Sequence, residues 1–395
     1  MSSADVVLCH PLRTPIGRFG GTLKSMPAPE LGAIIVRAVL KQSNLNPDKV
    51  DAAVFGHVIQ AGAGMNSGRQ AALNGGLPES VPTVTVNRVC GSGAEAIAQG
   101  ARLVRLGEAA CVIAGGMENM DQGPYLLDQA RWGYRMGSAS VEDATLRDGL
   151  NDAFSDKHSG WHTEDLVEKR QISREAQDAW AARSQQRFSK AQEKGLFDDE
   201  IVPVTVKNGK KETQFDKDES NRPDATVEGL AKLSPAFRDD GTITAGNAPG
   251  LNSAASAMIV ASRQFAEENG LEIAARLVAT GVGAVDPGMF GLGPVPAVHQ
   301  ALERAGWDIG DVGRVEINEA FAAIAIALTE EFDLSEEITN VEGGAIAHGH
   351  PIGATGAILT TRLLHSMKRD DIARGLVTLC IGGGQGIALL VARDI

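Results

Sequence analysis

The chain has 395 residues, 43% of them apolar, a formal net charge of −13 and four cysteines. The negative charge disfavours a nucleic-acid-binding surface, and four cysteines in a chain of this length make no disulfide framework. No apolar run approaches the roughly 18 residues of a membrane span, and the opening MSSADVVLCH lacks a signal-peptide pattern. The sequence therefore predicts a large globular protein of the cytoplasm that binds neither nucleic acid nor membrane.

Strand-like and helix-like segments alternate from the N-terminus, which indicates an α/β fold with a mostly parallel sheet. Apolar or β-branched runs predict strands, and runs of helix formers predict helices. The predicted strands are Asp5–Cys9, Ala52–His57, Thr83–Val86 and Ala110–Ala114, and the predicted helices are Pro29–Gln42, Ser67–Leu77 and Ala94–Leu106. Cys9 and Cys111 fall within apolar strands, where we expect core packing.

The composition changes between residues 121 and 245, where tryptophans, charge clusters and the polar run KNGKKETQFDKDESNRPD appear. A long helix is predicted there at Ser173–Gly195, and helix and strand patterns return at Ala254–Asn269 and Arg276–Gly283. We therefore expect an inserted loop domain at 121–245. Residues 1–120, completed by about 246–272, would form an N-terminal half, and residues 273–395 a C-terminal half.

An internal repeat supports two related halves. Asn44–His57 aligns with Gly306–Glu319, and Cys90–Ile97 aligns with His350–Ala357, in the same order and at nearly the same offset. Two ordered segments at one offset indicate a duplicated α/β unit. If the halves pack with pseudo-two-fold symmetry, the turns that carry Cys90 and His350 face each other across one cleft.

Cys90 lies in a tight turn, Asn87–Gly93, between a predicted strand and a predicted helix. A helix N-terminus favours a thiolate and leaves backbone N–H groups free to face an anion. Gly91 and Gly93 are expected to let a substrate approach the backbone. Cys90 is thus either a nucleophile or a buried structural cysteine, and the local sequence leaves both interpretations open.

Three further positions carry candidate chemistry. His350 lies between glycines and a proline at a helix start, where it either activates Cys90 or forms a metal pair with His348 or a packed loop. Cys380 ends an apolar strand and precedes three glycines, so it is either a second acid/base or a core cysteine. Asn318 is either a helix N-cap or a polar group that positions water.

Five motifs, NRVCGSG, GGMENM, INEAFA, GGAIAHGHPIGATG and CIGGGQG, occur in this order and resemble those of the thiolase family. The resemblance runs essentially end to end. It is strongest to the acetyl-CoA acetyltransferase and short-chain 3-ketoacyl-CoA branch of the family. It implies the thiolase fold, with duplicated α/β halves in a layered α-β-α-β-α core and an inserted loop domain.

The resemblance also implies an acyl-CoA C-acyltransferase, most simply converting two acetyl-CoA to acetoacetyl-CoA and CoA. Cys90 would carry the acyl group, and His350, with a water held by Asn318, would activate it and stabilise an enolate oxygen. Cys380 would exchange the α-proton, and the N–H groups of Cys90 and Gly382 would form an oxyanion site. Lowered or matched thiol pKa values are expected. Thiolysis of a longer, branched or modified 3-ketoacyl-CoA is an alternative, as is a thiolase-fold protein that binds acyl-CoA without turnover.

Coenzyme A and acyl-CoA are the implied partners, as substrate and product, with no cofactor and no metal. The residues that match coenzyme A or acyl-pocket positions are Arg222, His158, Ser159, Ala248, Pro249, Phe237, Phe290 and Phe321. Lysines at 207, 210, 211 and 217 would attract phosphates or form a solvated surface. Ala130–Gly137 resembles the segment that ties tetramers of this family together, which implies a homotetramer.

The chain departs from the family pattern at several pocket positions. Ser159 and Phe290 stand where methionines are usual, so one wall of the acyl pocket becomes smaller and polar and another becomes larger and flat. Ala248 and Pro249 replace an Ala-Ser pair, which removes a hydroxyl and a backbone N–H. His348 and Ala94 replace leucines. These departures put the acyl-chain preference, but not the four implied catalytic positions, in question.

Overall fold

A computed structural model describes residues 5–209 and 211–393. The first half contains β1 Val6–Arg13, β2 Gly17–Arg18, α1 Ala28–Ser43, η1 Pro47–Lys49, β3 Ala52–Gly56, α2 Ser67–Asn74, β4 Thr83–Val86, α3 Ser92–Arg105, β5 Cys111–Asn119, β10 Asn252–Ser262 and α7 Arg263–Glu268. The second half contains β11 Ile273–Ala284, η4 Pro287–Leu292, α8 Pro294–Ala305, η5 Ile309–Asp311, β12 Arg314–Ile317, α9 Ala322–Glu331, α10 Ala345–His348, α11 Thr355–Arg369, β13 Arg374–Ile381 and β14 Gln385–Ala392.

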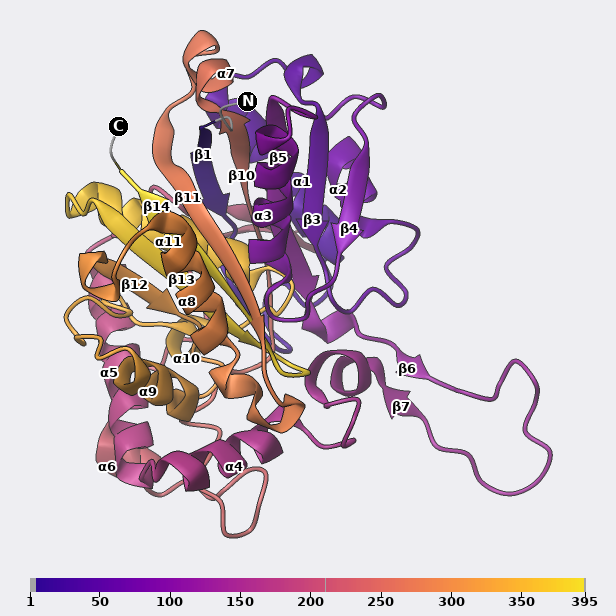
Figure 1. The fold of residues 1–395 in the computed structure, drawn as a ribbon. Coiled ribbons are helices and arrows are strands. Elements are labelled where there is room, and N and C mark those ends of the chain that lie inside the picture. The colour runs from indigo at the N-terminus through magenta and orange to yellow at the C-terminus, as the bar shows by residue number, and fades with distance from the viewer. Residues whose placement is uncertain (1–4, 210, 394–395) are drawn as a thin grey trace.

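The segment between β5 and β10 contributes a further set of short elements. These are η2 Met120–Gln122, β6 Tyr125–Leu126, β7 Glu142–Asp143, the π-helix η3 Thr145–Leu150, α4 Ser159–Arg170, α5 Arg174–Glu193, β8 Val204–Asn208, β9 Lys211–Phe215 and α6 Val227–Leu230. The long helix predicted at Ser173–Gly195 is α5, for which Ser173 is the N-cap. Figure 1 shows β6 and β7 at the base of an extended loop that projects from the body.

The two halves share one topology, which confirms the predicted duplication. The main sheet runs β12-β13-β14-β11-β1-β10-β5-β3-β4. On each side of the central antiparallel pair β1–β11, two further pairs are antiparallel: β1–β10 and β10–β5 in the first half, and β11–β14 and β14–β13 in the second. Among the described strands of this sheet, only the outer pairs β3–β5, β3–β4 and β12–β13 are parallel, so the prediction of a mostly parallel sheet is wrong. A pseudo-two-fold axis between β1 and β11 therefore relates the two halves. In Figure 1 the first half lies at upper right and the second half at lower left.

The layers follow from which helices cover which strands. Helices α1 and α2 pack on the outer face of the first half, and α8 and α9 pack on that of the second. Helices α3 and α11 lie between the halves, in one buried cluster with strands of both. The resulting α-β-α-β-α arrangement agrees with the predicted fold class. The domain boundaries drawn from the sequence stay a prediction.

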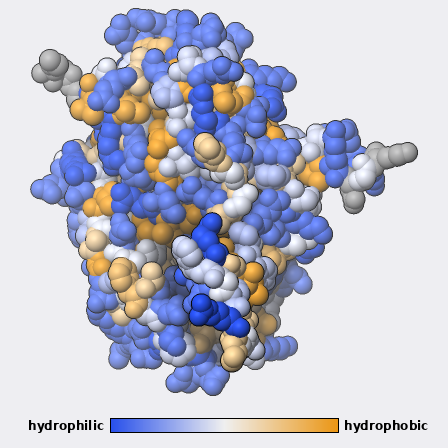
Figure 2. Space-filling view, turned by 90° about the vertical axis from the view of Figure 1, so that its right-hand side faces the viewer, coloured by the Kyte–Doolittle hydropathy of each residue, from blue (hydrophilic) through white to orange (hydrophobic). Residues whose placement is uncertain are grey.

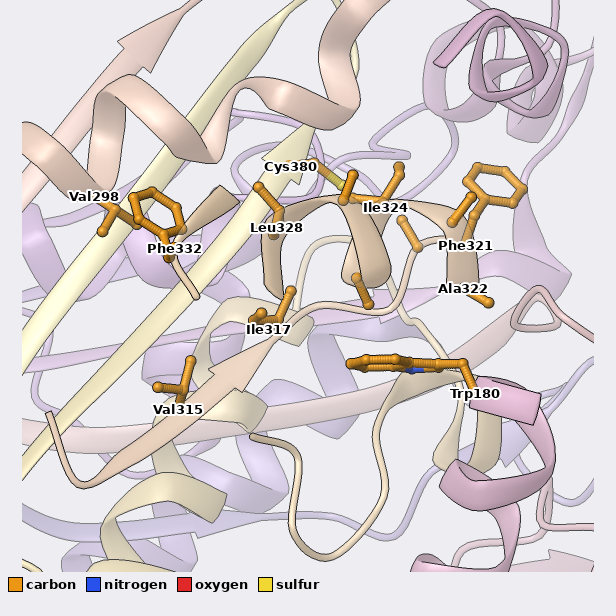
Figure 3. Packing of buried hydrophobic residues seen from close by; sticks show 14 of the residues in the cluster. Trp180, Val298, Val315, Ile317, Phe321, Ala322, Ile324, Leu328, Phe332 and Cys380 are labelled. Carbon is orange, nitrogen blue, oxygen red and sulfur yellow. The ribbon is translucent and has the colours of Figure 1, made fainter. Parts of the chain in front are cut away.

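The segment between β5 and β10 builds much of its packing on the second half. Leu166 of α4 and Trp180 of α5 belong to the same buried cluster as Ile324 of α9. Figure 3 shows the Trp180 ring lying against this cluster near the start of α9. The segment is inserted in the first half of the sequence, but its core is completed by the C-terminal half.

The N-termini of α3 and α11 approach each other through a symmetric pair of glycines. A Cβ on Gly93 would lie 2.6 Å from the backbone nitrogen of Ala357, and a Cβ on Gly356 would meet the backbone nitrogen of Ala94. Only glycine, which has no Cβ, allows the two backbones to approach this closely. The approach sets the separation of the two turns that precede these helices, those of Cys90 and His350.

We expect Gly356→Ala to lower the free energy of unfolding by about 1–3 kcal/mol, because the added methyl overlaps backbone of α3 and outweighs the helix-propensity gain. Urea denaturation followed by circular dichroism measures the change. Gly310→Ala is the matched control, since a Cβ at Gly310 has nothing within 4 Å. Equal stability of the two variants would show that the helices separate without cost.

Candidate active site

A cavity of about 710 Å³ opens where the two halves and the inserted segment meet. Cys90, from the turn before α3, and His350, from the turn before α11, both line it. Gly382 contributes from the turn between β13 and β14. The predicted approach of the Cys90 and His350 turns to one cleft is thus confirmed.

The turn that carries Cys90 is strained and held by side-chain hydrogen bonds. Val89 has φ +44°, a left-handed conformation that is unusual for a β-branched residue. The Asn87 side chain accepts the Val89 N–H at 2.8 Å. The Ser92 hydroxyl accepts the Arg88 N–H at 2.9 Å and donates to the Val89 carbonyl at 2.7 Å. This network fixes the backbone that presents the Cys90 thiol.

The pKa of Cys90 is raised, which contradicts the expectation of a lowered pKa. Withdrawal from water raises the pKa of the Cys90 thiol to about 11, and the nearby Glu118 carboxylate also raises it. The backbone N–H groups of Gly382 and of Cys90 itself point at the sulfur and oppose part of this rise. Cys90 is therefore a neutral thiol at neutral pH, and a base must take its proton when it reacts.

His350 is a neutral imidazole held on both ring nitrogens. Burial lowers its pKa to about 4. Its Nδ1 lies 2.7 Å from the Thr355 hydroxyl, and its Nε2 lies 3.3 Å from Nδ2 of Asn318. Its backbone N–H donates to Asn252 Oδ1 at 2.9 Å. A neutral, oriented imidazole at this cavity is chemically suited to accept a proton.

Asn318 is not a helix N-cap, because α9 begins four residues later with Phe321 as its capping residue. The Asn318 side chain is buried, and its Oδ1 has no hydrogen-bond partner among the described residues. The adjacent Glu319 carboxylate fixes this loop, since it accepts hydrogen bonds from Trp180 Nε1 at 2.9 Å and from the Ile346 N–H at 3.0 Å. Asn318 therefore directs one amide group toward His350 from a rigid backbone.

Cys380 lies behind the cavity rather than on its surface. It is buried at the end of β13, and Figure 3 shows it beside Ile324 of α9. Burial is the main cause that raises the pKa of its thiol, and the proximity of Cys90 raises it further. The two thiols are thus electrostatic neighbours, and both are protonated at rest.

The glycines beside Cys90 serve protein packing, which corrects their predicted role. A Cβ on Gly91 would lie 2.5 Å from Cδ1 of Ile381, and Gly93 faces the backbone of α11. These positions are therefore occupied by neighbouring chain and do not open a path for a substrate.

Three aromatic rings form a second wall of the cavity. The ring of His158 stacks on Phe237 with centroids 4.6 Å apart, and Phe321 meets Phe237 edge-on at 5.9 Å. His158 Nδ1 accepts the Gly160 N–H at 3.0 Å, and burial lowers the pKa of the ring to about 4. A flat, uncharged aromatic surface of this kind suits an extended, partly apolar ligand.

Comparison with known families identifies the fold. The model of the thiolase N-terminal domain matches residues 6–264, and that of the thiolase C-terminal domain matches residues 271–393. The chain belongs to the thiolase family.

Similar proteins extend this assignment over the whole chain. An acetyl-CoA acetyltransferase of Pseudomonas aeruginosa is 49% identical over 391 residues, which cover 99% of this chain and 100% of the relative. A probable acetyl-CoA acyltransferase of Staphylococcus epidermidis is 48% identical over 389 residues, 98% of each chain. The crystal structure of the Bacillus anthracis acetyl-CoA acetyltransferase superposes with a TM-score of 0.97 at 43% identity, covering 99% of both chains.

Most of the pocket positions that the sequence indicates line the cavity of this thiolase. Besides Cys90, His350 and Gly382, these are His158, Ser159, Phe237, Ala248, Pro249, Phe290 and Phe321. Arg222 is exposed and does not line the cavity. Its guanidinium donates a hydrogen bond to the Ala245 carbonyl at 3.3 Å, beside the loop that carries Ala248. Lys207 pairs with Glu212 in the β8–β9 hairpin, while Lys210 lies outside the described residues.

Sequence reasoning missed the residues that hold the site in place. Glu118 accepts N–H groups of Val58 at 3.1 Å and Gly353 at 3.0 Å, so it ties the first half to the loop after His350. Thr355 and Asn252 hold the His350 ring and backbone. Glu118 and Thr355 lie inside the motifs GGMENM and HPIGATGA, so the signal was present, but their partners are distant in sequence.

His348 does not share a ligand with His350. Its ring lies 5.9 Å from that of Phe188, and neither ring nitrogen has a hydrogen-bond partner among the described residues. Burial, with the charges of Arg362 and Arg13, lowers its pKa well below the usual value. In the part of the chain that the structure describes, no three acidic, histidine or cysteine side chains gather as a metal site.

We expect His348→Leu to make the stability less sensitive to acid. Because folding lowers the His348 pKa, the unfolded chain binds a proton first, and stability falls as the pH drops below about 6.5. Between about pH 7.5 and about pH 5.8, the variant should lose about 1 kcal/mol less free energy of unfolding than the parent.

Urea denaturation at both pH values measures this difference, and both lie above the isoelectric point of about 5.1. The same comparison between about pH 7.5 and about pH 8.5 is the control, because histidines do not titrate there. An unchanged acid sensitivity in the variant would mean that His348 finds a hydrogen-bond partner and is not held neutral.

Proposed function

We propose that this thiolase is an acyl-CoA C-acyltransferase that catalyses reversible Claisen condensation and thiolysis through a Cys90 acyl-enzyme. The observation that carries the proposal is the convergence of the Cys90 thiol, a neutral imidazole and two backbone N–H groups at one cavity, with the buried Cys380 thiol close behind Cys90. A nucleophile with a separate acid/base partner is the arrangement that ping-pong acyl transfer requires.

In the first half-reaction, the Cys90 sulfur attacks the thioester carbonyl of an acyl-CoA while its proton passes to His350 Nε2. The N–H groups of Cys90 and Gly382, which point at the sulfur, donate to the carbonyl oxygen as it gains charge. The carbon–sulfur bond to CoA then breaks, and the CoA thiolate takes the Cys380 proton and leaves. Cys90 is left as a thioester, with a Cys380 thiolate and a protonated His350.

In the second half-reaction, the Cys380 thiolate removes the α-proton of a second acyl-CoA. His350 and a water held by Asn318 stabilise the enolate oxygen, a role supported by the Asn318 Oδ1, which has no hydrogen-bond partner in the described part of the chain. The α-carbon attacks the Cys90 thioester, a carbon–carbon bond forms, and the Cys90 thiolate leaves and takes the proton from His350. Both thiols and the imidazole return to their resting states.

Acetyl-CoA is the acyl donor that we propose, with acetoacetyl-CoA and CoA as products. The names of the similar proteins from Pseudomonas aeruginosa and Bacillus anthracis support this choice. Ser159 and Phe290 line the cavity in place of the methionines usual in the family, and they favour a second candidate, a longer, branched or modified 3-ketoacyl-CoA.

Coenzyme A serves as substrate and product in this proposal, and the two half-reactions require no cofactor. The aromatic wall of His158, Phe237 and Phe321 suits the pantetheine arm, and Arg222 lies beside the loop of Ala248 and Pro249. The proposed location is the cytoplasm. Among the described residues, none of the helices has the length and apolar character to cross a membrane.

A homotetramer is the proposed assembly. The edge strand β4 leaves Val84 exposed, and the loop between β6 and β7 exposes Trp132 at 84% and Met136 at 97%. Large apolar side chains this exposed on a projecting loop favour burial against another copy. Figure 2 looks onto the side from which this loop projects, where apolar side chains are scattered among polar ones.

Cys90→Ala is expected to lower turnover at least about 1,000-fold and to abolish the acyl-enzyme, because Cys90 is the one cysteine among the described residues that lines the cavity. Cys380→Ala is expected to retain acylation at Cys90 but to lose condensation. Mass spectrometry of the intact protein after mixing with acetyl-CoA detects the acyl adduct, and a coupled assay follows turnover.

Cys111→Ala is the control, since Cys111 is buried in β5 away from the cavity. Acylation of the Cys90 variant would overturn the nucleophile assignment. Loss of acylation in the Cys380 variant would mean that the roles of the two thiols are reversed. If the parent forms no adduct and turns nothing over, the protein binds acyl-CoA without catalysis.

Thiolysis of a 3-ketoacyl-CoA series, from acetoacetyl-CoA to longer and branched chains, tests the acyl preference. We expect the highest kcat/KM with acetoacetyl-CoA. Ser159→Met and Phe290→Met should each change the ratio of short-chain to long-chain kcat/KM by about 10-fold, because one or two methylenes of pocket space are worth this much. A preference for longer chains in the parent would support the second candidate.

A further inference from the structure

Thr355, the first residue of α11, bridges the His350 ring to the backbone of its own turn. Its buried hydroxyl lies 2.7 Å from His350 Nδ1 and donates to the Pro351 carbonyl at 2.9 Å. Pro351 is four residues before Thr355, so this second bond is the usual one for a hydroxyl in the first turn of a helix.

A count of protons fixes the direction of the contact with His350. A threonine hydroxyl has one proton, and here the Pro351 carbonyl accepts it. The hydroxyl oxygen can then only accept at its short contact with Nδ1, so Nδ1 carries the ring proton. Because His350 is neutral, with a pKa of about 4, its Nε2 has no proton and presents a lone pair.

The other side of the ring agrees with this assignment. Asn318 Nδ2, a donor, lies 3.3 Å from Nε2. The opposite tautomer would place an Nε2–H against this amide N–H. It would become acceptable only if the Asn318 amide turned over and the Thr355 hydroxyl released the Pro351 carbonyl. The tautomer with the proton on Nδ1 satisfies the contacts to Thr355, Pro351 and Asn318 without any rearrangement.

The first half of the molecule contains the equivalent device. Ser92 is the first residue of α3, as Thr355 is of α11, and its hydroxyl donates to the Val89 carbonyl three residues earlier at 2.7 Å. In each half, a hydroxyl at the helix start ties down the turn that carries the reactive side chain. In the second half the hydroxyl oxygen also holds that side chain itself.

We infer that Thr355 is a positioning residue that keeps His350 in the Nδ1–H tautomer, so that Nε2 carries a lone pair that accepts a proton once the 3.3 Å contact from Asn318 Nδ2 gives way. This inference rests on the proposed function, in which Nε2 takes the Cys90 proton. The hydrogen bond from the His350 N–H to Asn252 holds the backbone of His350 in place, and Thr355 determines which ring nitrogen carries the proton. Without the hydroxyl, the Nδ1 proton has no acceptor, and the imidazole can give up the tautomer on which Cys90 depends.

Thr355→Val, nearly equal in volume, removes the hydroxyl, and Thr355→Ser keeps it. We expect Thr355→Val to lower kcat for acetoacetyl-CoA thiolysis by about 10- to 1,000-fold, since a wrong tautomer costs orders of magnitude in rate. KM and Tm should stay close to those of the parent. Thr355→Ser should restore kcat to within about 3-fold, a rescue that a purely structural role of the methyl group does not predict.

The tautomer itself can be observed without turnover. In protein labelled with [15N]histidine, magic-angle-spinning NMR near neutral pH separates protonated from unprotonated ring nitrogens, and the spectrum of His350→Ala assigns the His350 signals. We expect a protonated Nδ1 and an unprotonated Nε2 in the parent and in Thr355→Ser. The protonated Nδ1 signal should diminish in Thr355→Val.

A parent spectrum with protonated Nε2 would overturn the inference, as would a Thr355→Val variant that keeps kcat within about 3-fold. Should Thr355→Val fail to fold, the parent spectrum and the Thr355→Ser kinetics decide. Absence of turnover in the parent would instead refute the proposed function. The spectrum would then still test whether Thr355 sets the tautomer, so the two failures are distinguishable.

Discussion

The site depends on the close approach of two helix starts, one from each half of the duplicated fold. Gly93 and Gly356 bring the backbones of α3 and α11 together where a Cβ on either would overlap its neighbour. The turns before these helices carry Cys90 and His350, so the helix contact sets the distance between nucleophile and base. Backbone packing, which is stiff, thereby controls the geometry of side chains that would otherwise be free to move.

Buried carboxylates complete the support of these turns. Glu118 holds Val58 and Gly353, which lie in different halves, and Glu319 holds the inserted segment through Trp180 and the loop before His350 through Ile346. The Glu118 charge also acts on Cys90, whose thiol it helps to keep protonated. Cys90, Cys380 and His350 are therefore all uncharged at rest, and charge develops on them only during the reaction with a thioester.

The sequence predicts many of the strands and helices because the periodicity that marks each one lies within a few neighbouring residues. The internal repeat predicts that these elements form two related halves. The strand at Thr83–Val86 has the expected bounds, and the aligned segments Asn44–His57 and Gly306–Glu319 hold equivalent strands, β3 and β12. The alignment of Cys90 with His350 is out of register, because α3 starts at Ser92 and α11 starts at Thr355. What the sequence does not predict depends on neighbours brought in from elsewhere in the chain. A helix start favours a thiolate at Cys90, but burial outweighs it, and Gly91 faces Ile381, which is distant in sequence. The contact between the Thr355 hydroxyl and the His350 ring is another feature that the sequence does not predict.

The strand order also determines when during synthesis the protein can fold. β1 pairs with β10 and β11, so its partners emerge from the ribosome only after about 250 further residues. Trp180 likewise waits for α9 to complete its cluster. Non-local pairing of this kind slows folding and leaves apolar surface uncovered in the meantime. Contacts between the halves, β1 with β11 and Trp180 with α9, are therefore among the last that the growing chain can make.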